Sequence, residues 1–329
     1  MTQIGRYIAP TRRPEALGVH SMDCFHMSVP DLEHARQFYT KFGLDVREEG
    51  NGLSLYTFGH PHRWGQLGEG DRKAISHLSF GIFEDDVQRF QQRLQRAGVQ
   101  HLDPPPGFES NGMWFRDCNG LLIELRVAEK SSPDAKSSVE HEIGGPGRRT
   151  APIRGTTPAV RPRRLSHVLV FVRDVAESIK FYTDVLGMRL SDESGGVVAF
   201  MHGIHGSDHH MVAFAKSSAP GLHHCSWDVP SIQDIGLGAM HMADSGFSKG
   251  WGLGRHVLGS NYFHYVRDPW GSYSEYSCDI DYIPLEMDWQ GESHPIENSF
   301  YLWGPVPPED FAFNHEAASE PQLPGGIMN

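Results

Sequence analysis

The sequence predicts an α+β fold in which four βαβββ modules are joined in pairs to form two tandem domains. Two internal repeats support this prediction. VPDLEHARQFYTKFGL at residues 29–44 is similar to VRDVAESIKFYTDVLGM at residues 172–188. ISHLSFGIFEDDV at residues 75–87 is matched more loosely by LHHCSWDVPSIQDI at residues 222–235. We therefore expect modules to start near residues 22, 75, 165 and 222.

The first repeat predicts a strand followed by a helix. Each copy begins with an apolar run that ends in a Val-x-Asp step, so that Asp31 and Asp174 occupy the position of a helix N-cap. The helical stretch of each copy carries Phe-Tyr-Thr and is followed by Gly43 or Gly187, residues that can end a helix in the left-handed conformation.

A turn and a last strand complete each domain. RDCNGLLIEL at residues 116–125 and RDPWGSYSEY at residues 267–276 both place an Asp-x-x-Gly turn before a strand. Glu124 and Glu275 occupy the same position in these two strands. The second repeat contributes His77 and a His-His step to strands that start the second module of each domain.

Composition divides the chain into segments. We expect an N-terminal arm (1–17), an N-terminal module pair (18–127), a linker or long surface loop rich in Ser, Pro, Gly and Arg (128–163), a C-terminal module pair (164–282) and a tail (283–329). The tail is more consistent with packing than with disorder because it carries many aromatic residues, namely Trp289, Phe300, Tyr301, Trp303, Phe311 and Phe313.

Charge and cysteine content exclude several classes of protein. The formal net charge of −12 argues against general nucleic-acid binding, which needs a basic surface. The four cysteines are scattered without a CxxC pair, which favours a reducing compartment over a disulfide framework. No stretch approaches the roughly 18–20 apolar residues of a membrane span, and the first residues lack a signal-peptide pattern. We therefore expect a cytoplasmic protein without a membrane partner.

Histidines point to the chemistry. The chain has 20 of them, and many lie between His202 and His264. His167 and His224 open two predicted strands, and Glu275 lies in a third. Each alone is more often an ordinary hydrogen-bonded or solvated residue than a ligand. Together, on neighbouring strands, two imidazoles and one carboxylate would suit Fe(II) and leave open positions for substrate and dioxygen.

One segment is similar to a known family. GRHVLGSNYFHYVRDPWGSYSEY at residues 254–276 resembles the signature of the type I extradiol ring-cleavage dioxygenases, which belong to the vicinal oxygen chelate superfamily. The segment departs from that signature at His264, which we interpret as a substitution beside the pocket. The resemblance implies the glyoxalase-like fold of that superfamily over both module pairs.

The resemblance also implies the metal ligands, which fall on His167, His224 and Glu275. His224 is preferred to His223 because it begins its strand in register with the strand of His167. The implied metal is Fe(II), with Mn(II) as an alternative. The substrates would be a catechol and O2, and the product a ring-opened muconic semialdehyde or a related ketone.

Three further residues receive roles from the resemblance. His210 corresponds to the family's acid–base histidine, with His209 as the less favoured neighbour. His256 and Tyr265 correspond to residues that hydrogen-bond the substrate oxygens. An ordinary structural role also remains open for each of the three: His210 as a loop histidine, His256 as a turn histidine and Tyr265 as a core tyrosine. An apolar pocket or simple core packing would equally explain Phe200, Met201, Trp227 and Trp270.

The N-terminal pair is predicted to be a remnant without metal. Alignment places Cys24 opposite His167, His77 opposite His224 and Glu124 opposite Glu275, and no counterpart of the Gly-Arg-His segment precedes Glu124. Two other functions stay open. One is a glyoxalase-type lyase or isomerase of the same superfamily, and the other is a non-catalytic protein that binds a small molecule. The family likeness further implies a homo-oligomer.

Overall fold

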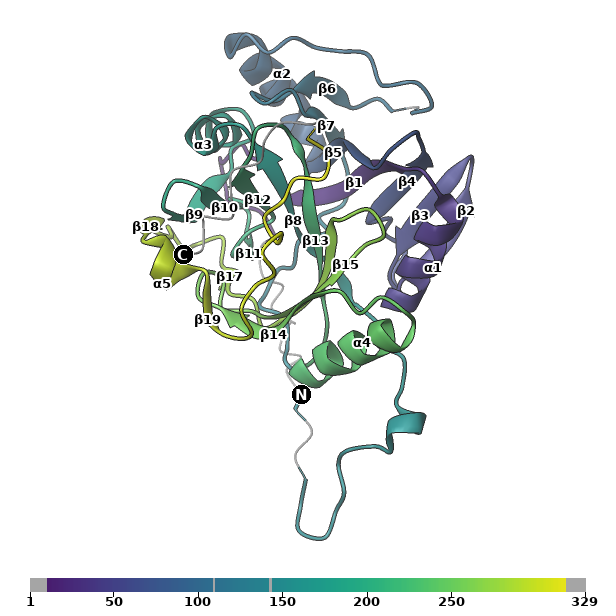
Figure 1. Cartoon of the computed structure of the whole chain (residues 1–329). Helices are drawn as coiled ribbons and strands as arrows, with labels where there is room; N and C mark the ends of the chain where they lie inside the picture. Colours follow the sequence, from purple (N-terminus) through teal and green to yellow (C-terminus); the bar gives the residue numbers. More distant parts are fainter. Residues whose placement is uncertain (1–10, 109, 142–143, 318–329) are drawn as a thin grey trace, which may run out of the picture.

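The computed structural model describes residues 11–108, 110–141 and 144–317. Its two large β-sheets lie side by side, with helices on their outer faces and the C-terminal segments wrapped over the second sheet (Figure 1). Within the described part of the chain, no helix is long and apolar enough to cross a membrane. Most of the predicted N-terminal arm and the end of the predicted tail lie outside the described residues.

The N-terminal sheet has the strand order β2-β3-β4-β1-β5-β7-β6. Its strands are β1 (Ser21–Val29), β2 (Asp45–Glu49), β3 (Gly52–Tyr56), β4 (Gly65–Glu69), β5 (Ala74–Ile82), β6 (Met113–Arg116) and β7 (Leu122–Val127). Its helices are α1 (Leu32–Phe42), the short 3-10 helix η1 (Glu84–Asp86) and α2 (Val87–Arg96).

The C-terminal sheet has the strand order β18-β9-β10-β12-β8-β13-β16-β15-β14-β19. Its strands are β8 (Arg164–Val172), β9 (Arg189–Ser194), β10 (Val198–His202), β12 (Val212–Lys216), β13 (Gly221–Asp228), β14 (Gly250–His256), β15 (Tyr262–Arg267), β16 (Tyr273–Cys278), β18 (Glu292–His294) and β19 (Tyr301–Trp303). Its helices are α3 (Val175–Asp184), α4 (Ile232–Asp244) and α5 (Ile296–Ser299), and β11 (Ser207–Asp208) pairs separately with β17 (Tyr282–Ile283).

The predicted fold class is confirmed, with one difference in detail. Three modules have the βαβββ order, but in the second module α2 is followed by only β6 and β7 among the described residues. A single bridge between Leu102 and Trp114 stands where a further strand would be. Residues 104–106 are all proline, which has no N–H for a sheet ladder, so this segment cannot pair as a regular strand.

The helix boundaries follow the predicted chemistry. The side chain of Asp31 accepts a hydrogen bond from the backbone N–H of His34 at 2.8 Å, and Asp174 accepts one from Glu177 at 2.9 Å. Gly43 ends α1 with a φ of 106°, a left-handed conformation that costs a glycine little. α3 ends at Asp184, slightly before Gly187.

Strand register makes the centres of the two sheets equivalent. Ser79 on β5 pairs with Cys24 on β1 and with Glu124 on β7. In the second sheet, Ser226 on β13 pairs with His167 on β8 and with Glu275 on β16. The alignment of Cys24 with His167 and of Glu124 with Glu275 is therefore confirmed by backbone pairing.

One hydrophobic core runs through both halves. At their junction, the rings of Phe42 on α1 and Tyr276 on β16 stack with centroids 3.9 Å apart, and the Tyr276 hydroxyl donates to the Phe42 carbonyl. This shared core holds the central strands of the second sheet in place. Between the halves, the described residues of segment 128–163 contain only the 3-10 helix η2 (Arg154–Thr156), and part of that segment projects below the body in Figure 1.

Candidate metal centre

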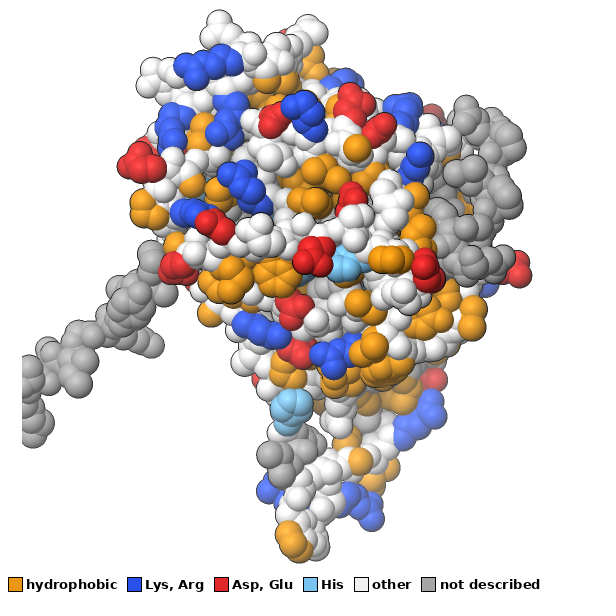
Figure 2. All heavy atoms as spheres, turned by 90° about the vertical axis from the view of Figure 1, so that its left-hand side faces the viewer, with side chains coloured by type: hydrophobic (Ala, Val, Ile, Leu, Met, Phe, Trp, Pro, Cys, Tyr) orange, Lys and Arg blue, Asp and Glu red, His pale blue; other side chains and the backbone are white. Residues whose placement is uncertain are grey.

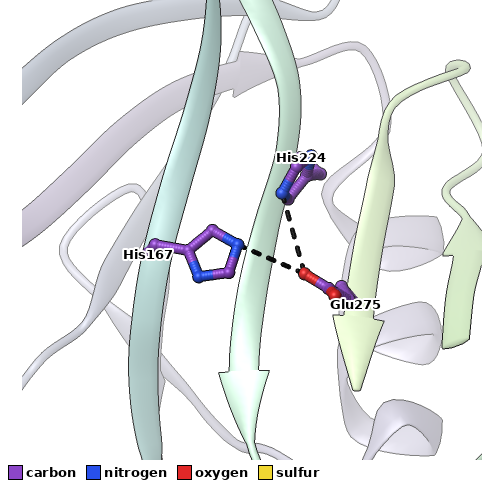
Figure 3. A group of neighbouring side chains, drawn as sticks. All are labelled: His167, His224 and Glu275. Carbon is purple, nitrogen blue, oxygen red and sulfur yellow. Dashed lines mark ion pairs between the residues drawn. The ribbon is translucent and has the colours of Figure 1, made fainter. Parts of the chain in front are cut away.

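Three neighbouring strands bring two histidines and a glutamate together. His167 comes from β8, His224 from β13 and Glu275 from β16, and each offers one ligand atom within 4.8 Å of the others. The Nε2 atoms of His167 and His224 lie 3.3 Å and 3.7 Å from the same oxygen, Oε2 of Glu275. Figure 3 shows both imidazoles pointing toward this carboxylate. All three side chains are buried.

A β-bulge contributes to this convergence. The pairing of β13 with β8 shifts register between Leu222 and His224, so His223 is left out of the ladder. Bulges re-aim side chains next to functional sites. Here the bulge lets two consecutive histidines approach each other, with their Nδ1 atoms 2.7 Å apart.

The contacts of His223 determine which nitrogen of His224 is free. His223 Nε2 lies 2.8 Å from the carbonyl of Phe311, which can only accept, so this nitrogen carries the proton. Burial lowers the pKa of His223 to about 4, which keeps the ring neutral and its Nδ1 bare. His224 must then donate from Nδ1, and its Nε2 keeps a lone pair toward Glu275. A neutral imidazole oriented in this way is the form that binds metals.

His167 is oriented by a second chain of hydrogen bonds. The hydroxyl of Ser166 donates to Asp208 at 3.1 Å, and Arg164 forms an ion pair with the same carboxylate at 2.6 Å. The Ser166 oxygen lies 3.2 Å from His167 Nδ1 and can accept its proton. With its proton on Nδ1, the neutral form of His167 directs the lone pair of Nε2 toward Glu275.

The carboxylate of Glu275 has one engaged oxygen and one free oxygen. Asn261 donates from Nδ2 to Oε1 at 3.1 Å. Oε2 of Glu275 and Nε2 of His224 are both buried without a hydrogen-bond partner among the described residues. Buried polar atoms are normally satisfied, so these two need an explanation. A divalent cation supplies one, because bare imidazole nitrogens and a carboxylate are the donors that such a cation takes. The residues therefore fit a metal ion.

A cavity with about 90 Å³ of free space adjoins the three ligands. His210, His256 and Tyr265 line it together with His167 and His224. Most of the remaining wall is apolar and includes Leu169, Val198, Phe200, Leu258, Ile296, Phe300 and Phe311. The last three come from the predicted tail, which therefore forms part of the cavity wall.

His210 stands beside the ligands. Its ring centroid is 4.0 Å from that of His167 and 4.8 Å from that of Phe200. Its Nδ1 lies 3.0 Å from Nδ1 of His209. Burial, followed by the neighbouring imidazoles, lowers the pKa of His210 well below its usual range, so the ring is neutral. Its second nitrogen, Nε2, remains for a molecule in the cavity.

His256 and Tyr265 form a second pair at the cavity. His256 donates from Nδ1 to the Phe300 carbonyl at 3.0 Å, which leaves Nε2 to accept from the Tyr265 hydroxyl at 2.9 Å. Burial raises the pKa of Tyr265 well above its usual range and lowers that of His256. The hydroxyl therefore keeps its proton beside Glu275.

The structure decides between the interpretations that the sequence left open. Trp227 and Met201 lie in the hydrophobic core, and Trp270 packs against that core, whereas Phe200 lines the cavity. His264 is not among the cavity-lining residues, because it neighbours Tyr265 along β15 and successive strand residues face opposite sides. In the tail, Phe311 is buried but Trp303 and Phe313 remain 45% and 37% exposed.

Several contributors to the site were not identified from sequence. Asn261 and Ser166 contact the ligands directly, and His223 and His209 contact His224 and His210. The two His-His steps in the sequence were a visible signal. In each step only one histidine was predicted to be functional. In the structure both histidines of each step take part in the hydrogen bonds of the site.

Comparisons with known proteins show the family of the chain. The model of the Glyoxalase/Bleomycin resistance protein/Dioxygenase superfamily matches residues 21–125 and 164–276. Metapyrocatechase 2 of Cupriavidus necator is 45% identical over 309 residues, covering 94% of this chain and 96% of that protein. A manganese-dependent 2,3-dihydroxybiphenyl 1,2-dioxygenase of Geobacillus genomosp. 3 is 24% identical, covering 84% of this chain and 91% of that protein. An extradiol ring-cleaving dioxygenase structure from B. fuscum shares the fold, with a TM-score of 0.72 at 21% identity, covering 92% of this chain and 84% of that one.

Proposed function

This chain belongs to the Glyoxalase/Bleomycin resistance protein/Dioxygenase superfamily, and from that membership we propose a reaction for its buried metal centre. The protein is an extradiol dioxygenase that opens a catechol ring beside the two hydroxyls. Both atoms of O2 enter the product, a muconic semialdehyde or its ketone analogue, so the reaction needs no external reductant. The observation that carries this proposal is the convergence of His167, His224 and Glu275 next to an apolar cavity lined by His210, His256 and Tyr265.

The metal ligands in this proposal are His167, His224 and Glu275, and the metal is Fe(II), with Mn(II) as the alternative. When bound, such an ion supplies Lewis acidity for the catechol hydroxyls and open positions where catechol and O2 meet. Asn261 holds Oε1 of Glu275, so that Oε2 is the oxygen directed at both histidines. The set of donors is oriented before the ion arrives, because Nε2 of each imidazole already faces Oε2 of Glu275.

His210 is assigned the proton transfers. A neutral imidazole with a bare Nε2 can take the proton of a catechol hydroxyl and later return it to an oxygen of the opened ring. Tyr265 is assigned the stabilisation of negative charge on a substrate oxygen, since its hydroxyl keeps its proton and can donate it as a hydrogen bond. His256 is assigned a hydrogen bond with a substrate hydroxyl, which its Nε2 can accept in place of the Tyr265 hydroxyl. The apolar wall excludes water from these exchanges.

The wall of the cavity favours a catechol without a charged substituent. Apart from histidine, Lys216 is the one charged residue that lines it within the described chain, and that side chain is exposed at the rim. Burying a carboxylate against Phe300, Ile296 and Val198 would be costly without a partner. We expect kcat/KM to be higher for methyl- or ethyl-substituted catechols than for catechols that carry a carboxylate.

The test is to load the protein with Fe(II) under anaerobic conditions, add catechol and admit oxygen. Uptake of one O2 per catechol, together with a yellow ring-opened product, supports the proposal. The superfamily's alternative chemistry, a glyoxalase-type lyase or isomerase, consumes no oxygen. Activity on a thiohemiacetal with no oxygen uptake on any catechol would contradict the dioxygenase assignment.

We further propose that the enzyme works in the cytoplasm as a homo-oligomer without a nucleic-acid partner. The net charge of −12 supports the last point. Figure 2 shows acidic and basic side chains interspersed with apolar ones on the face that carries β18 and α5, with no continuous basic field. The four cysteines are free, which suits a reducing compartment. Light scattering of the purified protein measures its oligomeric state.

A further inference from the structure

A chain of hydrogen bonds leads away from the cavity behind His210. Nδ1 of His210 lies 3.0 Å from Nδ1 of His209, and Nε2 of His209 lies 2.9 Å from Oδ2 of Asp192. The other oxygen of Asp192 accepts from the backbone N–H of Glu292 at 3.2 Å and contacts Nε2 of His294 at 2.9 Å. Neither His209 nor Asp192 is one of the three candidate metal ligands.

The chain is held by packing from three segments. Asp192 lies on β9, where it pairs with Phe200 on β10 and with Glu292 on β18. His209 is buried at 1% exposure between Phe200 and Trp289, and it is absent from the cavity wall that His210 lines. His209 and Asp192 therefore do not touch the substrate. They can act only through His210.

The hydrogen bonds specify where the protons are. Burial by itself raises the pKa of Asp192, but hydrogen bonds from His209 and His294 hold it below its usual range, so the group is an ionised acceptor. The neutral form of His209 donates from Nε2 to this acceptor, which leaves a lone pair on its Nδ1. A bare Nδ1 accepts from His210, which must donate from its own Nδ1. The remaining nitrogen of His210, Nε2, has no proton.

We propose that Asp192 and His209 are positioning residues that hold His210 in the tautomer with a bare Nε2 at the cavity, ready to take the proton of a catechol hydroxyl. This inference rests on the proposed function for the role of that proton. The tautomer itself is inferred from the hydrogen bonds of Asp192, His209 and His210 and does not depend on the reaction. The pair His223–His224 follows the same logic, but there the outer anchor is the Phe311 carbonyl rather than a carboxylate.

Replacing Asp192 by asparagine should reverse the tautomer without changing the shape of the group. The backbone N–H of Glu292 requires an acceptor, so the asparagine oxygen faces Glu292 and the NH2 faces His209. His209 then has to accept at Nε2 and donate from Nδ1, and His210 has to carry its proton on Nε2. A neutral His210 of that kind cannot take the substrate proton.

The experiment compares Asp192→Asn with Glu193→Gln, which makes the same change of a carboxylate to an amide at the next position of β9. With Fe(II) loaded, we expect kcat of Asp192→Asn to fall about 10²- to 10⁴-fold, the range for losing a general base, with KM and iron content unchanged. Glu193→Gln should keep wild-type kinetics. Wild-type kcat in Asp192→Asn, with the variant folded as judged by circular dichroism, overturns the proposal.

A second measurement does not depend on activity or metal, and its wild-type part does not depend on the folding of a variant. ¹⁵N-histidine NMR of the metal-free wild-type protein should show His209 protonated on Nε2 and His210 protonated on Nδ1, and Asp192→Asn should reverse both assignments. An Nε2-protonated His210 in the wild-type protein overturns the proposal. If these tautomers are found but the loaded protein cleaves no catechol, the proposed function fails while the positioning by Asp192 and His209 stands.

Discussion

At the centre of the C-terminal sheet, Glu275 keeps one carboxylate oxygen free of hydrogen bonds, whereas Glu124 at the same register of the N-terminal sheet has both oxygens engaged. Ser79 donates to Oε2 of Glu124, and Ser110 donates to Oε1. In the second sheet, Oε2 of Glu275 has no such donor among the described residues. A carboxylate already satisfied by two hydroxyls gains less from a cation than one with a free oxygen.

The other ligand positions differ in the same direction. His77 does not converge with Glu124 but stacks on His26, with ring centroids 3.9 Å apart. Cys24 stands at the register of His167, and burial raises the pKa of its thiol, so it stays protonated and is a poor ligand. Strand register also places Arg63 at the position that His210 occupies in the second sheet. Gly65 pairs with Phe25 as Val212 pairs with Val168, and Arg63 and His210 each lie two residues before these strand residues. The permanent positive charge of Arg63 at that position opposes the binding of a metal cation.

The comparison shows that the backbone shared by the two sheets only places residues at equivalent positions. A few side chains decide whether those positions bind a metal, and the surrounding hydrogen bonds decide it as much as the ligands do. Three pairs of matched substitutions and one single substitution test this view, ordered from the largest expected effect to the smallest.

Glu275→Gln should abolish iron binding and activity, because the neutral amide removes the one negative charge that faces the ion. After anaerobic loading with Fe(II) and desalting, metal analysis should find close to none, against about one equivalent in the wild-type protein. Glu124→Gln is the matched change in the first sheet and should retain iron and activity. Loss of iron in both variants would break the comparison between the two sheets.

Tyr265→Phe should lower kcat about 10²-fold, because it removes a hydroxyl that donates to developing charge, with iron content unchanged. Trp114 lies opposite Glu124 as Tyr265 lies opposite Glu275, so Trp114→Phe is the matched change. Steady-state kinetics with catechol should show no effect on kcat for that variant. An equal fall in both would indicate a general effect on the fold.

His223→Ala should weaken Fe(II) binding about 10- to 100-fold, the usual effect of removing a partner that orients a ligand. Without His223, nothing holds the proton of His224 on Nδ1. Titration against a competing chelator measures the affinity. Ser76→Ala changes the residue before His77 in the first sheet and should leave the affinity as it is; a wild-type affinity in His223→Ala would refute the assigned role.

Cys24→His should have the smallest effect, since it completes a nominal His-His-Glu set in the first sheet without creating a site. Arg63 and the two serines on Glu124 remain in place. Metal analysis should still give about one equivalent of iron per chain. A second equivalent would show that ligand identity alone separates the two sheets.

Local patterns were enough to predict the frame of this site. Strand alternation and the repeats located the strands of His167, His224 and Glu275, and the same alignment assigned Cys24 its place, which backbone pairing confirmed. The N-caps at Asp31 and Asp174 followed from the chemistry of helix ends. These features depend on neighbours along the chain or on a period of two, and both are visible in one dimension.

The sequence by itself determined which residues could be ligands, and the tertiary structure decided which nitrogen of each histidine is free to bind or to take a proton. His223 is anchored by a carbonyl 88 residues away, and His209 by a carboxylate 17 residues away on another strand. A neutral imidazole is protonated on the nitrogen that faces an acceptor, so its chemistry depends on what packs beside it. No spacing in the chain records that contact, because it arises only when β9, β13 and the C-terminal tail come together.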